Sequence, residues 1–456
     1  MNRPSFVVSR RLVLQGAAAM AGATFLPTRV LAAGDAVLFT IADLHSPYAR
    51  LPALLQTIRR LNAEAAKPAA LLLNGDIFEL GNAVSVRSGG AADFAFLKAL
   101  AAELPVIVNI GNHEPDTVGD LATFVALANA AGVEVISNLV DNRTGRFFAP
   151  VSTRFGLGGF SLAALGLATT NPFVYPQPSR DTLTFLDPAA FVASAYADAR
   201  GEADVGLVMS HAGVTADKAF VDTLSAGTIV QGAHDHLTFS TERNGGPYFH
   251  GSSWGVELGI LDLARTSDGV ASSYRTVAIA PSGGDAELAD MIAGLKDEHL
   301  NGEDTAVLAE IDRDMTMHES ILIAAEAVRD AADADVAVLG HTTFGAPLAK
   351  GPLTKYDFDA FIRFGGGISA VDISGRQLAQ IVARGNQFMA ETLEGRTGDY
   401  VHVAEMDIDP ARTYRFATNA WTGINQEAYL GTTDLSFEAV GDLELKSLVA
   451  AYLAAD

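Results

Sequence analysis

Short apolar runs alternate with amphipathic segments along the chain from residue 36 onward. Each run is closed by polar residues or glycine, which is typical of a buried strand. We expect such strands at 37–42, 70–73, 106–110, 133–136, 162–167, 205–209 and 228–230. Helical periodicity lies between several of them, at 51–66, 92–102 and 121–131. This alternation predicts a layered α/β domain, and we expect edge strands at 256–263 and 273–279 to close it.

Two polar stretches, 281–285 and 301–304, interrupt the pattern and flank a charged helical segment at 286–300. We therefore expect a first domain over 34–284 and a linker with a helix over 285–304. A second, smaller α+β domain should follow over 305–456, beginning with a helix near 319–332. The chain contains no internal repeat.

The first 33 residues have the order of a cleavable export signal. Arg10 and Arg11 follow Ser9, an apolar run occupies 16–26, and small residues stand at 30–33. That run is shorter than the roughly 20 residues that span a bilayer. The paired arginines resemble a twin-arginine leader, and an ordinary Sec signal is the alternative. We expect a periplasmic or secreted protein that uses the export machinery and keeps no stable membrane insertion after cleavage.

The composition limits which classes of partner the chain can bind and which kinds of catalytic or metal site it can form. The 456 residues include 54 acidic and 31 basic side chains, a formal charge of −23, which becomes −27 without the four leader arginines. Such a balance argues against a nucleic-acid polymer or an anionic membrane surface as partner. The absence of cysteine excludes disulfides, thiolate zinc sites and cysteine nucleophiles. An anionic substrate would need positive charge from something other than side chains.

Residues of the types that can bind metals follow five of the expected strands. In layered α/β folds, ligands bind where the carboxyl ends of strands meet. Aspartate, asparagine and histidine without sulfur suit Mn, Zn, Fe, Co or Mg. Asp-x-His and His-x-His pairs point to one face if their segments are extended. Two divalent ions that share a carboxylate would use the whole set, which comprises Asp43, His45, Asp76, Asn112, His113, His211, His234 and His236.

The order and spacing of these residues resemble the calcineurin-like binuclear metallophosphoesterases. Gly-Asn-His-Glu-Pro-Asp at 111–116 further resembles the branch of 5′-nucleotidases and 2′,3′-cyclic nucleotide phosphodiesterases, and so do 351–354 and 361–377 in the second domain. The resemblance implies a layered β-sandwich flanked by helices, followed by a nucleotidase-like α+β substrate domain.

The resemblance also implies residue roles. One metal would be held by Asp43, His45, Asp76 and His236, and the other by Asp76, Asn112, His211 and His234, with Asp76 bridging. Metal-activated hydroxide would attack phosphorus while His113 and Asp116 assist. His113 as a third metal ligand or a supporting residue, and Asp116 as the cap of the next helix, are the alternatives. Glu114 is expected to be structural, and Asp235 is left out of the ligand set.

In the second domain, Phe364 and Trp421 fall near the base-stacking positions of the nucleotidases, although both could instead be core residues. The family's arginine is missing from 341–347, and 425–428 replaces a glycine-rich turn; Arg363 and His341 are the available substitutes. The function indicated is hydrolysis of small-molecule phosphomonoesters, nucleotides in particular. A thiosulfohydrolase on the same fold and a metal-retaining binding protein without catalysis are the alternatives.

Overall fold

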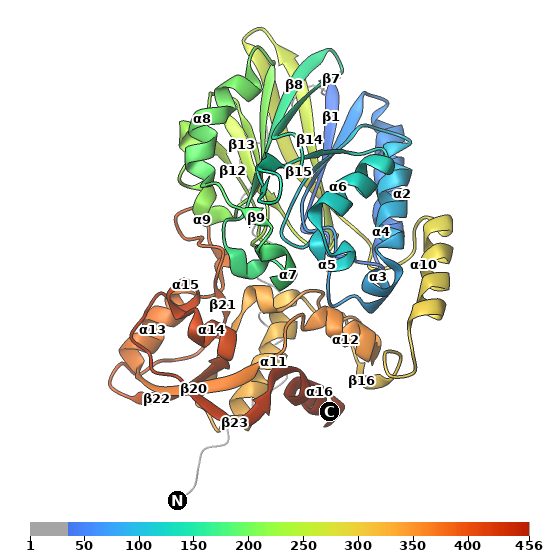
Figure 1. Ribbon diagram of the computed structural model, residues 1–456. Helices are drawn as coiled ribbons and strands as arrows, with labels where there is room; N and C mark the ends of the chain where they lie inside the picture. The colour runs from blue at the N-terminus through green and yellow to red at the C-terminus, as the bar shows by residue number, and fades with distance from the viewer. Residues whose placement is uncertain (1–34, 456) are drawn as a thin grey trace, which may run out of the picture. The chain divides into compact units, whose positions relative to one another are not determined.

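The computed structural model describes residues 35–455, shown in Figure 1. The expected leader at 1–33 lies outside the described residues. None of the described helices combines the length and apolarity needed to cross a bilayer.

Two six-stranded sheets pack face to face in the first part of the chain. One sheet has the order β15-β14-β1-β2-β3-β4 and the other β12-β13-β11-β10-β8-β7. The first contains β1 (Ala36–Ala42), β2 (Ala69–Asn74), β3 (Val106–Asn109), β4 (Glu134–Ile136), β14 (Glu257–Thr266) and β15 (Gly269–Ala278). The second contains β7 (Ser152–Leu157), β8 (Phe160–Ala168), β10 (Val205–His211), β11 (Ile229–Gly232), β12 (Thr238–Arg243) and β13 (Gly246–Gly251).

Apolar side chains fill the space between the sheets and cover their outer faces. Leu38, Leu72 and Ile107 of the first sheet share one buried cluster with Leu162 and Leu207 of the second. The outer face of the first sheet is covered by α2 (Leu51–Ala65), α4 (Ala91–Ala101) and α6 (Leu121–Ala130), and that of the second by α8 (Pro188–Arg200). The expected sandwich flanked by helices is confirmed. Because both faces are covered, β1 and β2 are buried along their whole length.

The expectation of two edge strands is half right. β15 lies at the edge of its sheet, but β14 pairs with β1 on one side and β15 on the other. Leu258 and Ile260 of β14 face the helices, whereas Leu261 and Leu263 face the second sheet. A strand that is apolar on both faces in this way is typical of the interior of a sheet.

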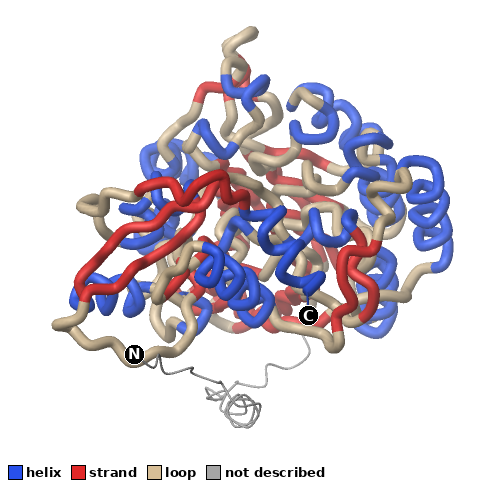
Figure 2. The backbone as a smooth tube through the Cα atoms, turned by 90° about the horizontal axis from the view of Figure 1, so that it is seen from below, coloured by secondary structure: helices blue, strands red, loops and turns tan. Residues whose placement is uncertain are grey.

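The later part of the chain forms a four-stranded sheet, β17-β22-β20-β23, with its own apolar clusters. Figure 2 views the molecule from this end. The strands are β17 (Val336–Ala337), β20 (Gly367–Ser374), β22 (Thr413–Asn419) and β23 (Glu438–Glu444). The helices are α11 (Met317–Ala331), α12 (Lys355–Phe361), α13 (Gly375–Arg384), α14 (Ala420–Ile424), α15 (Gln426–Leu430) and α16 (Leu445–Ala455).

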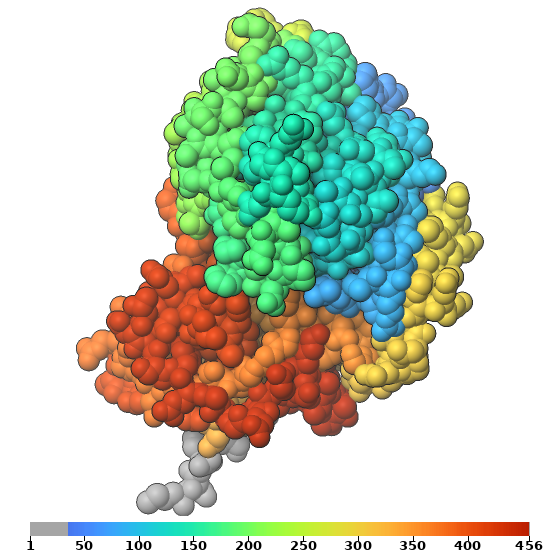
Figure 3. Space-filling view, in the orientation of Figure 1, coloured from blue at the N-terminus to red at the C-terminus, as the bar shows by residue number. Residues whose placement is uncertain are grey.

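Between the two parts, α10 (Ala286–His299) packs against α2, α3 (Ala83–Ser88) and α4. Figure 3 shows α10, in yellow, lying on the blue surface of that region. Ion pairs join Asp285 to Arg59 and Asp304 to Arg87, so both ends of the segment are tied to the first part of the chain. The domain boundaries proposed above stay a prediction.

Candidate metal centre

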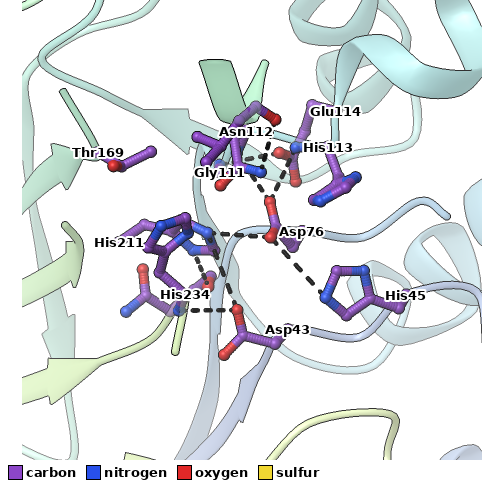
Figure 4. A network of polar contacts seen from close by, with 12 residues as sticks. Asp43, His45, Asp76, Gly111, Asn112, His113, Glu114, Thr169, His211 and His234 are labelled. Carbon is purple, nitrogen blue, oxygen red and sulfur yellow. Dashed lines mark hydrogen bonds and ion pairs between the residues drawn. The ribbon is translucent and has the colours of Figure 1, made fainter. Parts of the chain in front are cut away.

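The last residue of β10 and the loops after β1, β2, β3 and β11 bring the predicted metal-binding residues together, and Figure 4 shows most of them. Three groups of side chains have ligand atoms within 4.8 Å of one another. They are Asp43, His45 and His236; Asp76, His211 and His234; and His45, Asp76 and His113. All these loops leave the carboxyl ends of strands, which explains why residues up to 193 positions apart in sequence meet here.

The side chains converge, but the backbone that carries them does not have the extended conformation that was expected. Asp43, His45 and Asp76 have φ of 47°, 54° and 52°, and His234 and His236 have φ of 79° and 54°. These left-handed conformations disfavour residues with a Cβ by about 1–2 kcal/mol each, so the segments are not extended. The turning of the backbone, rather than alternation along a strand, aims the side chains. Strain of this kind tends to gather at functional sites.

Two glycines of the motifs are required by close packing around Asp76 and His211. A Cβ on Gly75, whose φ is +71°, would lie 2.4 Å from His211 Nδ1. A Cβ on Gly111 would lie 2.3 Å from Asp76 Oδ1. Any larger residue would displace these two candidate ligands. Glu114 supports the same loops, because its carboxylate accepts the backbone N–H groups of Ile77 and Gly111.

Asp76 stands at the centre of the network in Figure 4. Its Oδ1 accepts the backbone N–H groups of Asn112 at 2.7 Å and His113 at 2.9 Å. Its Oδ2 lies 3.2 Å from His211 Nε2 and 3.8 Å from His45 Nε2. Burial works to raise the pKa of this carboxyl, but the histidines around it lower the pKa well below its usual value. A carboxylate between two groups of histidines is placed where a bridging ligand is needed.

The first group presents ring nitrogens to a common point. His45 Nε2 lies 2.9 Å from His236 Nε2, while His45 Nδ1 faces the Phe78 carbonyl and the Glu79 carboxylate, both at 3.3 Å. Nδ1 therefore carries the proton and Nε2 has a free lone pair. Burial lowers the pKa of His45 to about 4 and that of His236 well below its usual value, so both rings are neutral. Neutral imidazoles held this way through the other nitrogen are typical of metal ligands.

In and beside the second group, Asn112 Oδ1 and His234 Nδ1 are buried without a hydrogen-bond partner, and His211 Nε2 faces the carboxylates of Asp76 at 3.2 Å and Asp43 at 3.8 Å. The other nitrogen of His211 donates to the Asn74 carbonyl at 2.9 Å, which leaves Nε2 aimed at Asp76. Burial lowers the pKa of His234 to about 3. Unpaired buried atoms are costly unless something binds them. Oxygen and imidazole donors without sulfur fit two hard or borderline divalent cations.

His113 and Asp116 form a short pair beside this centre. Asp116 Oδ2 accepts from His113 Nδ1 at 2.6 Å, and Glu114 rather than Asp116 occupies the N-cap of α5 (Pro115–Val118). The helix-cap alternative for Asp116 therefore does not hold. Burial lowers the pKa of His113, but Asp116 and then Asp76 raise it to about 9. His113 belongs to one of the three groups of possible ligands. The alternative in which it is a third metal ligand therefore stands.

Arg363 reaches the same pair from the later part of the chain. Its Nη2 lies 3.0 Å from His113 Nε2, and its Nε donates to the buried Glu79 carboxylate at 2.7 Å. Nε2 of His113 can accept from the guanidinium only when the single ring proton is on Nδ1. Arg363 thus opposes protonation of Nε2, but Asp116 and Asp76 outweigh it, because the pKa of His113 is still raised to about 9. Arg363 also lowers the pKa of Glu79, which outweighs the opposing effect of burial.

A cavity of about 460 Å³ opens beside the metal-binding residues. Its walls include Asp76, His113 and His236 on one side and Arg363, Phe364 and Trp421 on the other. Phe364 is 46% exposed and Trp421 is 44% exposed, which excludes the core interpretation of both rings. The two arginines that line the cavity are engaged, since Arg180 donates to the Tyr175 and Phe173 carbonyls and Arg363 to Glu79.

Three features of the site escaped the sequence reasoning. Glu79, which supports His45, carries no recognisable sequence signal, because its partner Arg363 stands 284 residues away. Asp235, which was left out of the ligand set and given no other role, accepts the Val214 backbone N–H and so supports the loop of His234 and His236. His341 was considered only as a substrate contact, yet it bonds His402 and the His236 carbonyl.

Comparisons with known proteins agree with this geometry. Residues 38–245 match the family model of calcineurin-like phosphoesterases, and residues 303–430 match that of the 5′-nucleotidase C-terminal domain. The uncharacterized metallophosphoesterase YunD of Bacillus subtilis is 22% identical over 374 residues, which cover 78% of this chain and 79% of YunD.

Two solved structures share the fold over 92% of this chain. A 5′-nucleotidase precursor from Thermus thermophilus has a TM-score of 0.59 at 16% identity, with 96% of that chain covered. The sulfate thiohydrolase SoxB of Thermus thermophilus, in complex with glycerol, has a TM-score of 0.62 at 17% identity, with 94% covered. At such low identity the likeness concerns the fold alone. With both family models matched in order along the chain, this protein belongs to the calcineurin-like phosphoesterases of the 5′-nucleotidase type, which are hydrolases with a dinuclear metal centre.

Proposed function

We propose that this protein hydrolyses small phosphate monoesters, nucleotides in particular, at a centre of two divalent cations. The observation that carries the proposal is the set of buried Asp and His side chains around Asp76, whose ligand atoms lie within 4.8 Å of one another in three groups. The proposed ligands of one metal are Asp43, His45, Asp76 and His236. Those of the other are Asp76, Asn112, His211 and His234.

When bound, two such cations polarise phosphoryl oxygens and lower the pKa of a coordinated water toward about 7. The chain's own residues supply the proton chemistry beside them. Asp116 holds the His113 Nδ1–H at 2.6 Å, which fixes Nε2 as the nitrogen that faces the cavity. We assign His113 the task of giving a proton or hydrogen bond from Nε2 to the phosphoryl or leaving oxygen, in the doubly protonated ring that Asp116 and Asp76 favour by raising its pKa to about 9.

The cavity wall supports a planar leaving group. Phe364 and Trp421 are half-exposed rings that line the cavity from the second part of the chain, and stacking of a base on such a ring is worth about 1–3 kcal/mol. Arg363 Nη2 lies 3.0 Å from His113 Nε2, and its Nε is held by Glu79. Because both lining arginines already have partners, the cavity favours substrates with one phosphoryl group over diphosphates.

A substrate panel tests this function. The mature chain, loaded with Mn²⁺ or Zn²⁺, is incubated with AMP, a UDP-sugar, 2′,3′-cyclic AMP and p-nitrophenyl phosphate, and the product phosphate is measured. We expect the highest kcat/KM for AMP and a lower value for the UDP-sugar. Equal rates with AMP and p-nitrophenyl phosphate would indicate a phosphatase that does not bind the base. No hydrolysis of any compound by the metal-loaded protein would refute the proposal.

A thiosulfohydrolase is the second candidate, and the fold shared with SoxB favours it. The lack of arginine in 341–347, where nucleotidases are expected to carry one, points the same way. Sulfate release from a peptide bearing a cysteine S-thiosulfonate, without phosphate release from AMP, would decide for this candidate.

We further propose that residues 1–33 export the protein to the periplasm or the medium by the twin-arginine route. Replacing both Arg10 and Arg11 by Lys should leave the precursor uncleaved in the cytoplasmic fraction, because that route reads the arginine pair. Cell fractionation with an antibody to the mature chain measures this, and Arg29→Lys serves as the control. Normal export of the double variant would favour the Sec alternative.

A further inference from the structure

Three histidines outside the proposed ligand set form a chain of hydrogen bonds in the later part of the protein. His318, at the start of α11, lies with Nδ1 2.8 Å from Nδ1 of His402. Nε2 of His402 lies 2.9 Å from Nδ1 of His341. Nε2 of His341 faces the backbone carbonyl of His236 at 3.4 Å. The chain therefore ends on the loop that carries two candidate metal ligands.

The carbonyl at the end of the chain fixes the proton on every ring. A carbonyl oxygen only accepts, so His341 must donate through Nε2–H and accept through Nδ1. His402 then donates through Nε2–H and accepts at Nδ1 from His318. Each N···N contact holds one proton, so His341 and His402 carry a single proton each, and burial lowers the pKa of all three rings. Stacking holds the rings in place, with His341 parallel to Tyr400 at 4.5 Å and His402 to Phe388 at 5.4 Å.

The loop that receives this contact has a backbone that needs external support. His234 and His236 both have left-handed φ, and three contacts hold the turn between them. The His234 N–H donates to Asp43, and the Asp235 carboxylate accepts from the Val214 N–H. The third contact, from His341 to the His236 carbonyl, comes from the other part of the chain.

A second link from the later part of the chain reaches the same metal position. Arg363 binds Glu79, whose carboxylate lies 3.3 Å from His45 Nδ1. His45 and His236 belong to one candidate ligand group, with their Nε2 atoms 2.9 Å apart. By contrast, His211 of the other group is oriented by the Asn74 carbonyl, within the first part of the chain.

We propose that His341 is a positioning residue for His236, so that the later part of the chain controls occupancy of the metal position formed by Asp43, His45 and His236. The inference rests on the proposed function, because it takes His236 as a ligand. The hydrogen bond that His341 Nδ1 accepts from His402 Nε2 supports the tautomer in which His341 donates from Nε2 toward the His236 carbonyl. The position formed by Asn112, His211 and His234 should lose much less affinity, because the His234 backbone is also held by the bond from its N–H to Asp43.

Two substitutions of one residue separate positioning from bulk packing. His341→Leu removes the donor, whereas the side-chain amide of His341→Gln can still donate to the carbonyl. The full mature chain is titrated with Mn²⁺, and bound metal is measured after dialysis, with electron paramagnetic resonance to distinguish coupled from isolated Mn²⁺. His299→Leu, at the end of α10, is the matched control.

We expect wild type, His341→Gln and His299→Leu to bind two coupled Mn²⁺ ions. His341→Leu should keep one ion tightly and bind the other about 10–100-fold more weakly, which leaves an isolated-ion signal at limiting metal. His402→Leu, which removes only the support of the His341 tautomer, should shift the same site in the same direction by less. Circular dichroism establishes that each variant is folded; if His341→Leu does not fold, the His402→Leu titration decides alone.

Unchanged affinity at both positions in folded His341→Leu, or in His402→Leu when it stands alone, would overturn the inference. Equal weakening of both positions would overturn it as well, because the effect would then lie outside the Asp43–His45–His236 group. These outcomes are distinct from failure of the proposed function. That failure would appear in the wild-type protein, as binding of fewer than two metals or as no phosphate release in the substrate panel.

Discussion

Replacing Asp76 by Ala is expected to remove both metals and reduce phosphate release to the uncatalysed background. Asp76 is the carboxylate that both candidate ligand groups approach, with Oδ2 at 3.2 Å from His211 Nε2 and at 3.8 Å from His45 Nε2. Its Oδ1 also fixes the backbone of Asn112 and His113. The change therefore deletes a shared ligand and loosens the loop that carries a second one. Metal analysis after dialysis and the rate with AMP measure the two effects.

The same variant should lose the stabilisation that metal binding gives. A ligand at 100 times its Kd stabilises the folded state by about 2.7 kcal/mol. Added Mn²⁺ should raise the melting temperature of the wild type and leave that of Asp76→Ala unchanged. Asp268→Ala, in the exposed turn between β14 and β15, should behave as wild type. Retention of two metals and normal turnover by Asp76→Ala would show that the dinuclear centre has been placed wrongly.

The strands and the candidate ligands could be read from the sequence because both depend on local patterns. Buried strands such as β1 and β2 are continuous apolar runs, and the residues after them carry the ligand chemistry. Parallel strands end at the same edge, so strand-end residues meet without knowledge of the loops. Phe364 and Trp421 were placed by the resemblance to the nucleotidases rather than by such a pattern, and both line the cavity.

The conformation of the loops could not be read in this way. Asp43 and His45 were expected on an extended segment, whereas both have left-handed φ. Such a backbone is favoured by glycine or asparagine, and the local sequence does not call for it. It is imposed by tertiary contacts, such as the hydrogen bond from the Trp254 N–H to the Asp43 carbonyl. The residues that support the ligands could not be predicted for the same reason, because such contacts join distant parts of the chain. His341 and His236, for example, stand 105 residues apart.

Replacing His113 by Ala is expected to keep both metals and lower kcat with AMP by about 10²–10⁴-fold, the usual contribution of a positioned acid or base. The prediction follows from one contact of His113 and from its place in the cavity wall. Asp116 takes the Nδ1–H at 2.6 Å, which leaves Nε2 to act in the cavity. The alternative in which His113 is a metal ligand predicts a different result, since removing a ligand lowers metal content together with the rate. Metal analysis beside the kinetics therefore separates the two roles.

Asp116→Asn is the matched change, because it keeps the size of the side chain and removes the charge that holds the His113 proton. We expect it to retain two metals and to lower kcat by less than His113→Ala, and the double variant should be no slower than His113→Ala alone. That non-additivity is the signature of two residues acting as a unit. Additive losses, or a normal rate in His113→Ala with metals bound, would contradict the pair. The neighbouring Asp120→Asn, whose carboxylate caps α6, provides the control for changes in this region, because its contact with the Thr123 N–H lies outside the cavity.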